Sequence, residues 1–492
     1  MDDQVVQART PAANTRLSRQ WVGIVIAGII PPALYILVVG HYGVNMLFGD
    51  DWTVIPVVDS AVNHHLTWQL LWAQHNENRM LFPNLLFILF GRIDHLDAKT
   101  IMYFSALLLT GGFLLLLCVY RSYAGAFMGP FQTLLAGLVW FSLSEFENTL
   151  WAFQLAWFMV DASLLLLLFL FSRRPRSYLL LSAAAIVAVV ASYSSLQGLI
   201  LWPVGLLCLL WRREDRRRSL IQGAIWIVAT LVTTGLYFLG FDFSSRATGG
   251  GSIGYAISHP VGVAKYIMAA VGNVLPSGWP PSHSSVIFHE IVGLMLLVVA
   301  AIVLWHSWRE RSQERMIPLP AALILFAVLF DVSIALGRSN SGASQALSYR
   351  YTMANLLLLI GVAIYGFSRF AKPAMRSHRR SRHARSRKYR LARPGLLSTL
   401  VLFLSAQIAQ GTNIGLASSH ATQQLRETGA LTVLNLTKMP SAQAKILVEQ
   451  DVYPPGLGPI EPLLRAAAHD KLSVFAPGAD KLYVGHHGHR PR

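Results

Sequence analysis

The chain has 492 residues, of which 54% are hydrophobic and 13% are charged, with a mean hydropathy of +0.46 and a formal net charge of +17. A charged fraction this small cannot cover the surface of a soluble protein. Apolar runs of about 17–25 residues recur along the chain, which is the length that spans a hydrocarbon core. Membrane barrels instead show alternating segments of about ten residues. The sequence therefore predicts an all-α, polytopic transmembrane helical bundle.

About eleven apolar runs are predicted to be membrane spans. The first run follows a short basic segment, and no small-residue cleavage site is found. We therefore expect an uncleaved helix that follows a cytoplasmic segment, residues 1–20. The main domain is predicted at 21–411, and a small extracytoplasmic segment at 412–492. The runs lie at 21–40, 98–120, 128–143, 151–171, 178–192, 195–211, 220–240, 284–305, 317–336, 349–369 and 395–411.

The positive charge is concentrated in loops that alternate in the chain. With a cytoplasmic N-terminus, the dense basic clusters at 172–177, 212–218, 308–315 and 376–393 all fall inside, as the positive-inside rule requires. The longest cluster, 376–393, is interpreted as a solvated loop attracted to anionic lipid headgroups. It lacks interleaved aromatic residues and a folded module, so no nucleic acid is expected as a partner. A multi-pass protein of a bacterial inner membrane, with its C-terminus outside, is the predicted location.

Two adjacent carboxylates, Asp50 and Asp51, follow the first run in the segment FGDDWTVIPVVDS (48–60). Adjacent residues point in different directions, so one carboxylate can face a substrate while the other braces the loop. A positioned carboxylate can act as general base toward a hydroxyl. The aromatic ring of Trp52 offers a flat surface for a sugar or a lipid edge. The simpler interpretation is that the two acids cap a turn.

A second polar cluster, QHNENR (74–79), precedes a short apolar segment at 80–94 that is too short to span and is predicted to be an interfacial helix. The cluster is interpreted either as a set of hydrogen-bonding side chains at the start of a helix or as a polar cap with an internal ion pair. A divalent metal on two of its side chains is conceivable, although the histidine spacing matches no HExxH motif. Its candidate site residues are His75, Asn76, Glu77 and Arg79.

The next outer turn, SEFENTLWAFQ (144–154), carries Glu145 and Glu147 at a span entrance. A helix would place Glu147, Trp151 and Gln154 on one face, because they stand at positions i, i+4 and i+7. These four residues are candidates for catalysis or substrate binding. The alternative is an acidic first turn that favours the helix dipole.

A late outer loop, GRSNSGASQALSYRY (337–351), is rich in glycine and serine and is bracketed by Arg338 and Arg350. Two guanidinium groups at a bilayer surface suit a phosphate headgroup. Tyr349 is a further binding candidate. The alternative is that Arg350 snorkels at the interface. Acids and arginines from three distant loops are thus predicted on one outer face.

These motifs resemble the polytopic GT-C glycosyltransferases, such as the protein mannosyltransferases and the aminoarabinose and arabinosyl transferases. The segment GDDW (49–52) resembles their paired acidic motif, with Asp50 at the position of the catalytic base. The segment ALSYRY (346–351) resembles a phosphate-binding motif, with Tyr349 as an insertion before Arg350. HNENRMLFP (75–83) and SEFENTLWAFQ resemble the stretches that precede the interfacial helix and form the acidic second loop.

The resemblance, which covers residues 20–410, implies transfer of a sugar from a polyprenyl-phosphate carrier to a glycan, lipid or protein acceptor at the outer face. The predicted catalytic residues are Asp50, at the base position that the resemblance implies, together with Asp51, Glu77 and Glu147. The alternative functions are a flippase or transporter of lipid-linked oligosaccharide and a polysaccharide polymerase or ligase. Transporters place polar groups mid-membrane, whereas the predicted spans here are nearly free of charge, with Asp161 and Asp331 as exceptions.

Overall fold

The computed structural model describes residues 11–173, 177–211, 216–244, 253–309, 317–370, 387–436, 441–453 and 459–479. These residues are almost entirely helical, and their one sheet is a two-stranded hairpin. The all-α prediction is confirmed. The cores of the basic clusters at 172–177, 212–218 and 308–315 and most of the cluster at 376–393 lie outside the described residues.

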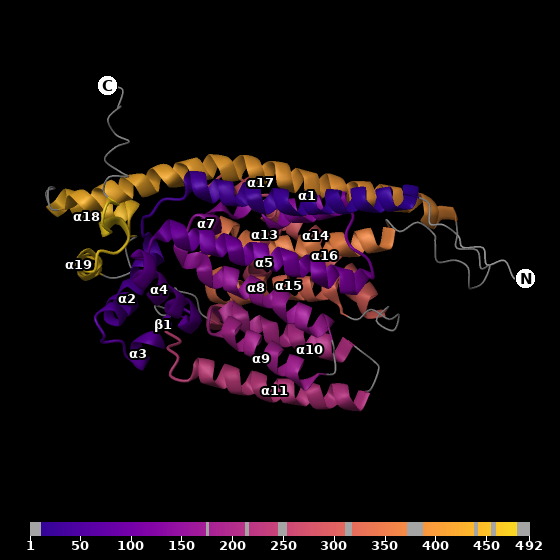
Figure 1. Cartoon of the computed structure of the whole chain (residues 1–492), viewed down its shortest axis with the longest axis horizontal. Coiled ribbons are helices and arrows are strands. Elements are labelled where there is room, and N and C mark those ends of the chain that lie inside the picture. The colour runs from indigo at the N-terminus through magenta and orange to yellow at the C-terminus, as the bar shows by residue number, and fades with distance from the viewer. Residues whose placement is uncertain are drawn as a thin grey trace, which may run out of the picture.

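The long helices run side by side along one axis of the molecule (Figure 1). Eight of them are long and apolar enough to cross a membrane, so this is a multi-pass membrane protein. The runs predicted at 128–143, 178–192 and 195–211 form shorter helices. The α-helices of the bundle are α1 (Pro11–Tyr42), α5 (Ala98–Ala124), α6 (Pro130–Trp140), α8 (Leu155–Ser172), α9 (Tyr178–Ser192), α10 (Leu201–Trp211), α11 (Arg216–Phe238), α14 (His283–Arg309), α15 (Leu319–Arg338), α16 (Thr352–Phe370) and α17 (Arg387–Asn435).

Shorter elements connect these helices. The α-helices among them are α2 (Ile55–Val62), α3 (Trp68–Leu71), α4 (Leu81–Asp94), α7 (Phe146–Thr149), α12 (Ile253–Ser258), α13 (Pro260–Gly272), α18 (Ser441–Asp451) and α19 (Glu461–His469). The hairpin strands are β1 (Gln74–His75) and β2 (Asn78–Arg79). The 3₁₀ helices are η1 (Gly49–Val54), η2 (Leu143–Glu145), η3 (Ala152–Gln154), η4 (Leu196–Ile200), η5 (Ser339–Ser341), η6 (Ala343–Leu347), η7 (Tyr349–Tyr351) and η9 (Ser473–Phe475).

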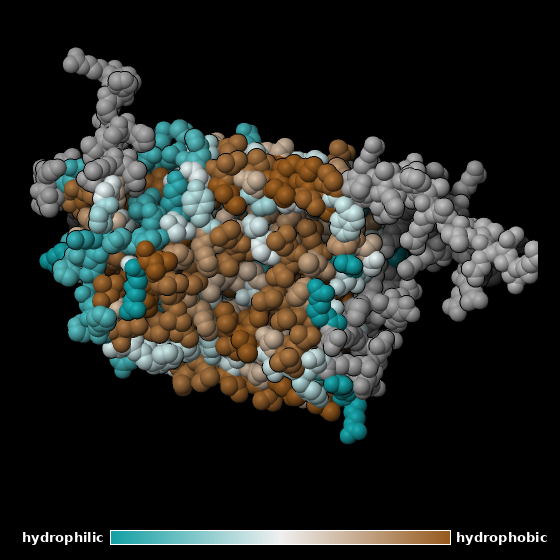
Figure 2. All heavy atoms as spheres, viewed as in Figure 1, coloured by the Kyte–Doolittle hydropathy of each residue, from teal (hydrophilic) through white to brown (hydrophobic). Residues whose placement is uncertain are grey.

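Apolar side chains cover the middle of the bundle, as the brown band in Figure 2 shows. The exposed apolar side chains of the long helices include Leu37 on α1, Leu231 on α11 and Leu402 on α17, each at least 66% exposed. Teal, hydrophilic residues gather over the end where α2, α3, α18 and α19 lie. Exposed leucines at this density are stable only against lipid tails, so the band marks the membrane-facing surface.

The elements of the first predicted outer loop and the C-terminal helices lie together at that hydrophilic end (Figure 1). The amide of Gly49 donates to the carbonyl of Val452 at 2.9 Å, and the amide of Ser473 donates to the carbonyl of His95 at 2.7 Å. The domain boundary predicted after residue 411 falls within α17, which continues to Asn435 without a break. The C-terminal segment is therefore attached to the first loop and is continuous with the last span.

Candidate active site

The first loop turns directly into η1, which places Asp50 at the hydrophilic end. Gly49 has φ +54°, a conformation that favours glycine. The Asp50 carboxylate lies 3.6 Å from the Nε2 atom of His75. Thr53 donates its hydroxyl to the backbone carbonyl of Asp50 at 2.6 Å. Asp50 is thus held on a short, tightly turned element, and its side chain remains 21% exposed.

The β1–β2 hairpin presents the second polar cluster. Asn76 occupies the left-handed region with φ +48°, which asparagine tolerates better than most residues. His75 lies 3.3 Å from the Thr53 hydroxyl through Nδ1, and its ring packs 4.9 Å from the ring of Phe153. The hairpin therefore fixes the imidazole beside Asp50.

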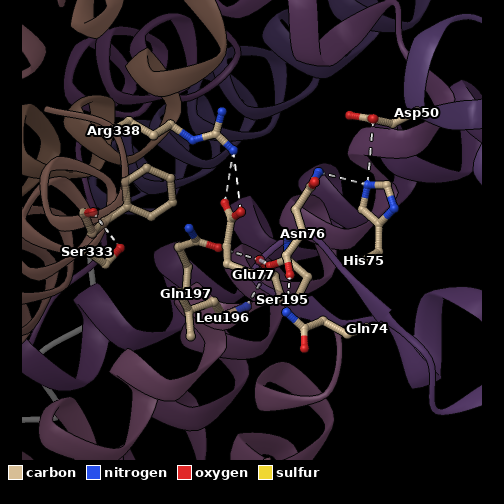
Figure 3. Close-up of polar contacts among 12 residues, drawn as sticks. Asp50, Gln74, His75, Asn76, Glu77, Ser195, Leu196, Gln197, Ser333 and Arg338 are labelled. Carbon is tan, nitrogen blue, oxygen red and sulfur yellow. Dashed lines mark hydrogen bonds and ion pairs between the residues drawn. The ribbon is translucent and has the colours of Figure 1, made fainter. Parts of the chain in front are cut away.

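The carboxylate of Glu77, on the same turn, forms an ion pair with Arg338 at the end of α15. The closest nitrogen–oxygen distance is 3.1 Å. The Glu77 backbone carbonyl accepts from the Tyr237 hydroxyl at 2.7 Å, which fixes the turn against α11. Figure 3 shows His75 pointing toward Asp50 and Glu77 pointing toward Arg338. One hairpin thus links the acidic first loop to the arginine loop.

Glu147 and Arg350 form a second pair across the same end of the bundle. Their closest distance is 3.7 Å, and Glu147 also accepts from the Ser348 hydroxyl at 3.1 Å and from the Arg350 amide at 3.3 Å. Asn148 donates to the Arg350 carbonyl at 2.9 Å. The acidic turn and the arginine loop therefore support each other, as the predicted common face requires.

A small polar cavity of about 50 Å³ lies between these groups. Of the residues singled out in the sequence, its wall includes Asp50, His75, Asn76, Glu77, Gln154, Arg338 and Arg350. Sequence reasoning missed other members of the wall, notably Asn78, Trp157, Ser194, Ser195, Gln197 and Tyr351. Asn78 stands inside the polar cluster 74–79, whereas Trp157 and Gln197 stand within predicted apolar runs, which do not indicate a site.

An apolar cavity of about 620 Å³ adjoins the polar one. Both walls contain Glu77, Gln197, Ile334 and Arg338. Most of the remaining lining is apolar and comes from η4, α10, α15 and the end of α11, including Leu199, Ile200, Pro203, Phe238, Leu329 and Val332. An apolar chain can therefore lie beside the bundle while a polar group attached to it meets Arg338.

The electrostatic surroundings keep Asp50 ionised. Burial raises its pKa, but the hydrogen bond and charge of His75, followed by the charges of Arg350 and Arg338, outweigh that effect and leave the pKa below its ordinary value. An ionised carboxylate accepts protons and cannot donate them. Asp50 has the protonation state of a general base.

Asp51 points into the protein instead, and it is absent from the cavity wall. It is 2% exposed, and its carboxylate accepts from the Phe48 amide at 3.0 Å. Burial raises its pKa to about 7, although the Phe48 amide and the charge of Arg426 oppose the increase. The guanidinium of Arg426, on α17, lies 3.3 Å from the centre of the Phe48 ring. Asp51 braces the loop, and a catalytic role for it stays a prediction.

The two tryptophans predicted to contact substrate form hydrogen bonds to the protein backbone instead. Trp52 is fully buried, and its indole donates to the Leu47 carbonyl at 2.9 Å, so its ring cannot carry a sugar. Trp151 is 6% exposed and donates to the Phe48 carbonyl at 3.0 Å. Both indoles fix the backbone before η1.

Three further binding candidates are buried away from the cavity wall. Arg79 donates to the carbonyls of Trp72 at 2.8 Å and Leu239 at 3.0 Å, so its guanidinium is used to hold the backbone after α11. Glu145 is fully buried, which raises its pKa well above the ordinary range. Tyr349 donates its hydroxyl to the Ser277 carbonyl at 2.6 Å. These side chains position other elements and do not face a ligand.

The described residues contain no group of three or more histidine, cysteine or acidic side chains placed to hold a metal ion. Within this part of the chain, Asp50 and His75 form a pair, which is fewer ligands than metal sites in proteins use. The sequence-level possibility of a divalent metal therefore gains no support from the described geometry.

No family model matches the chain, and no curated protein matches it. Two similar solved structures are of an archaeal oligosaccharyltransferase from Archaeoglobus fulgidus. One is tethered to an acceptor peptide (TM-score 0.44, 11% identity, 87% of this chain and 59% of that one). The other, named AglB, is in complex with an inhibitory peptide and a dolichol-phosphate (TM-score 0.46, 13% identity, 87% and 60%). The present chain spans about three-fifths of each neighbour's length. At this similarity the likeness carries no functional argument.

Proposed function

We propose that the protein transfers a sugar from a polyprenyl-phosphate carrier to an acceptor hydroxyl. The observation that carries the proposal is the shared wall of the two cavities. An apolar cavity of about 620 Å³ meets a polar one at Arg338 and Glu77. A substrate with a long apolar chain, an anionic link and a polar head fits that order of surfaces.

The chemistry requires a base and a stabiliser of the leaving group. Asp50 accepts the proton of the acceptor hydroxyl while the hydroxyl oxygen bonds to the anomeric carbon. The bond from that carbon to the carrier phosphate breaks, and the carrier leaves with the electron pair. Arg338 and Arg350 line the same cavity and can offset the added negative charge on the phosphate.

The proposed site lies on the outer face of a bacterial inner membrane, with a cytoplasmic N-terminus. The basis is the positive-inside pattern of the sequence. The site elements lie at the hydrophilic end of the bundle (Figures 1 and 2). The partners are then the carrier-linked donor, membrane lipids and a glycan, lipid or protein acceptor.

The test uses full-length protein in nanodiscs with radiolabelled polyprenyl-phosphate sugars and a membrane extract as acceptor source. Asp50→Asn should bind the donor with unchanged affinity and lose about 10²–10⁴-fold in turnover. Asp97→Asn is the matched control, because Asp97 caps α5 and asparagine caps helices as well. Donor binding without transfer by the wild type would contradict the proposal and favour the transporter.

A further inference from the structure

The wall of the polar cavity combines charged and uncharged side chains. Asp50, Glu77, Arg338 and Arg350 supply the charges, whereas the uncharged members include Gln154, Gln197, Asn78, Ser194, Ser195 and Trp157. We propose that these uncharged side chains form the subsite for the transferred sugar and that this subsite selects a neutral sugar. This inference rests on the proposed function and names the substrate class for that site.

Two amide groups of the cavity wall have unused hydrogen-bonding capacity. Gln154 is 5% exposed, and within the described residues no group hydrogen-bonds its carboxamide, although it lines the cavity. Gln197 is 3% exposed; its carbonyl oxygen accepts from the Ser195 hydroxyl, and no described acceptor takes its amide protons. A buried amide that faces a cavity without a partner costs free energy unless a ligand or water satisfies it.

The neighbouring groups fix these amides in place. Asn78 accepts from the Leu196 amide at 2.9 Å, and its side-chain oxygen lies 3.0 Å from the Ser195 hydroxyl oxygen, so the hairpin is joined to η4. A Cβ on Gly198 would lie 1.9 Å from the Ala191 carbonyl oxygen, so only glycine allows η4 to pack this close to α9. Gln197 is therefore held rigidly, and Figure 3 shows it beside Glu77. A preorganised amide loses little entropy on binding.

Trp157 supplies the apolar surface that sugar rings require. Its ring packs 5.4 Å from the ring of Phe330 and 6.2 Å from that of Tyr351, so it is anchored on α8 while it still lines the cavity. Among the described residues, none accepts from its indole nitrogen. A flat aromatic face beside planar amides matches the alternating apolar and hydroxyl surfaces of a sugar. Trp157 takes the place that the sequence assigned to Trp52.

The pairing of the charged groups in and beside the cavity wall determines the class of sugar. The acidic groups Glu77 and Glu147 are paired with the two arginines, and Asp50 is beside His75. An ammonium or carboxylate on the sugar would therefore lose hydration and meet only amides, an indole and charges that already have a partner. Hydroxyl groups are satisfied by the same amides. The subsite favours a neutral hexose or pentose.

The experiment measures equilibrium binding to nanodisc-embedded full-length protein. The ligands are bare polyprenyl phosphate and the same carrier bearing a neutral hexose, an amino sugar or a uronic acid. Wild type should bind the neutral donor at least tenfold more tightly than either charged donor. Gln154→Met, which keeps the side-chain volume, should lose at least tenfold for the neutral donor and less than twofold for the bare carrier. Trp157→Phe should likewise weaken binding of the neutral donor more than binding of the bare carrier.

The bare carrier serves as an internal reference, so a partly unfolded variant cannot imitate the effect. Gln69→Met, at an exposed position of α3, is the matched control. Equal losses for both ligands in Gln154→Met, or tighter binding of a charged donor by wild type, would overturn the inference alone. If wild type does not bind the bare carrier, and Arg338→Gln does not change binding of the sugar-bearing carrier, the proposed function is overturned as well.

Discussion

Glu77 and Arg338 are separated by 261 positions in the chain, yet a carboxylate oxygen of Glu77 lies 3.1 Å from the Arg338 guanidinium. The pair stands where the apolar and polar cavities share a wall. Under the proposed function, a carrier phosphate that enters from the apolar side would compete with Glu77 for Arg338. The ion pair fixes the position of the guanidinium.

Removal of the competing carboxylate should tighten binding of the carrier. Glu77→Gln keeps the shape of the side chain and leaves the backbone bond to Tyr237, so Arg338 becomes available without loss of the hairpin. We expect a severalfold lower Kd for polyprenyl phosphate, whereas Arg338→Gln should raise the Kd about tenfold or more. Binding to nanodiscs measures both, with Glu461→Gln on exposed α19 as the control. Weaker binding by Glu77→Gln would show that Glu77 contacts the donor favourably.

The pH dependence of turnover tests the role of His75. The pKa of Asp50 lies below its ordinary value because His75, Arg350 and Arg338 together outweigh burial. The base form of Asp50 is therefore present above pH about 4 and is lost as pH falls through the lowered pKa. His75→Leu removes the hydrogen bond and the charge, so the acidic limb of kcat/KM should move to higher pH. An unchanged limb in the variant, with the pH range extended below 4 to include the wild-type limb, would exclude Asp50 as the titrating base.

The raised pKa of Asp51 predicts that stability, rather than turnover, depends on pH through this group. Its pKa is raised by burial to about 7 in the folded protein, so between pH 4 and 7 the folded state binds a proton that the unfolded state has released. Stability from this group is therefore present at low pH and is lost as pH rises to 7. At about 1.4 kcal/mol per pKa unit the loss is about 4 kcal/mol.

Asp51→Asn removes this titration and can still accept from the Phe48 amide. Thermal unfolding in detergent should show that the variant gains stability relative to wild type as pH rises from 4 to 7. Turnover should stay within a few-fold, in contrast to Asp50→Asn. A loss of turnover as large as that of Asp50→Asn, with stability unchanged, would return Asp51 to the catalytic set.

The sequence predicted the spans and the common face well, because both follow from hydropathy and charge. Every predicted apolar run contains a helix, and Asp50, Glu77, Arg338 and Arg350 line one cavity. The sequence pattern does not predict which side chain of a polar cluster faces the cavity. Arg79, two positions after Glu77, lies on the β2 strand and turns toward the α11 carbonyls.

Side-chain direction explains why other candidates do not line the cavity. The adjacent acids do not by themselves show which of them faces a ligand, whereas in η1 Asp50 lines the cavity and Asp51 is buried. Arg426 was not singled out because it lies beyond the last predicted span, on a helix expected to end near residue 411. Such long-range contacts depend on tertiary packing, which periodicity does not encode.

The apolar cavity can be tested at Gly337, where an added side chain would enter open space. A Cβ there meets no atom within 4 Å, the residue lines the cavity, and α15 tolerates a better helix former. Gly337→Leu should therefore leave folding intact and occupy the volume of the lipid chain. We expect at least a tenfold weaker Kd for a long-chain polyprenyl-phosphate sugar and a smaller effect for an analogue with two isoprene units. Gly235→Leu is the matched control, because Gly235 is exposed on α11, has equal space and does not line the cavity. Equal losses for both chain lengths would place the lipid elsewhere on the bundle.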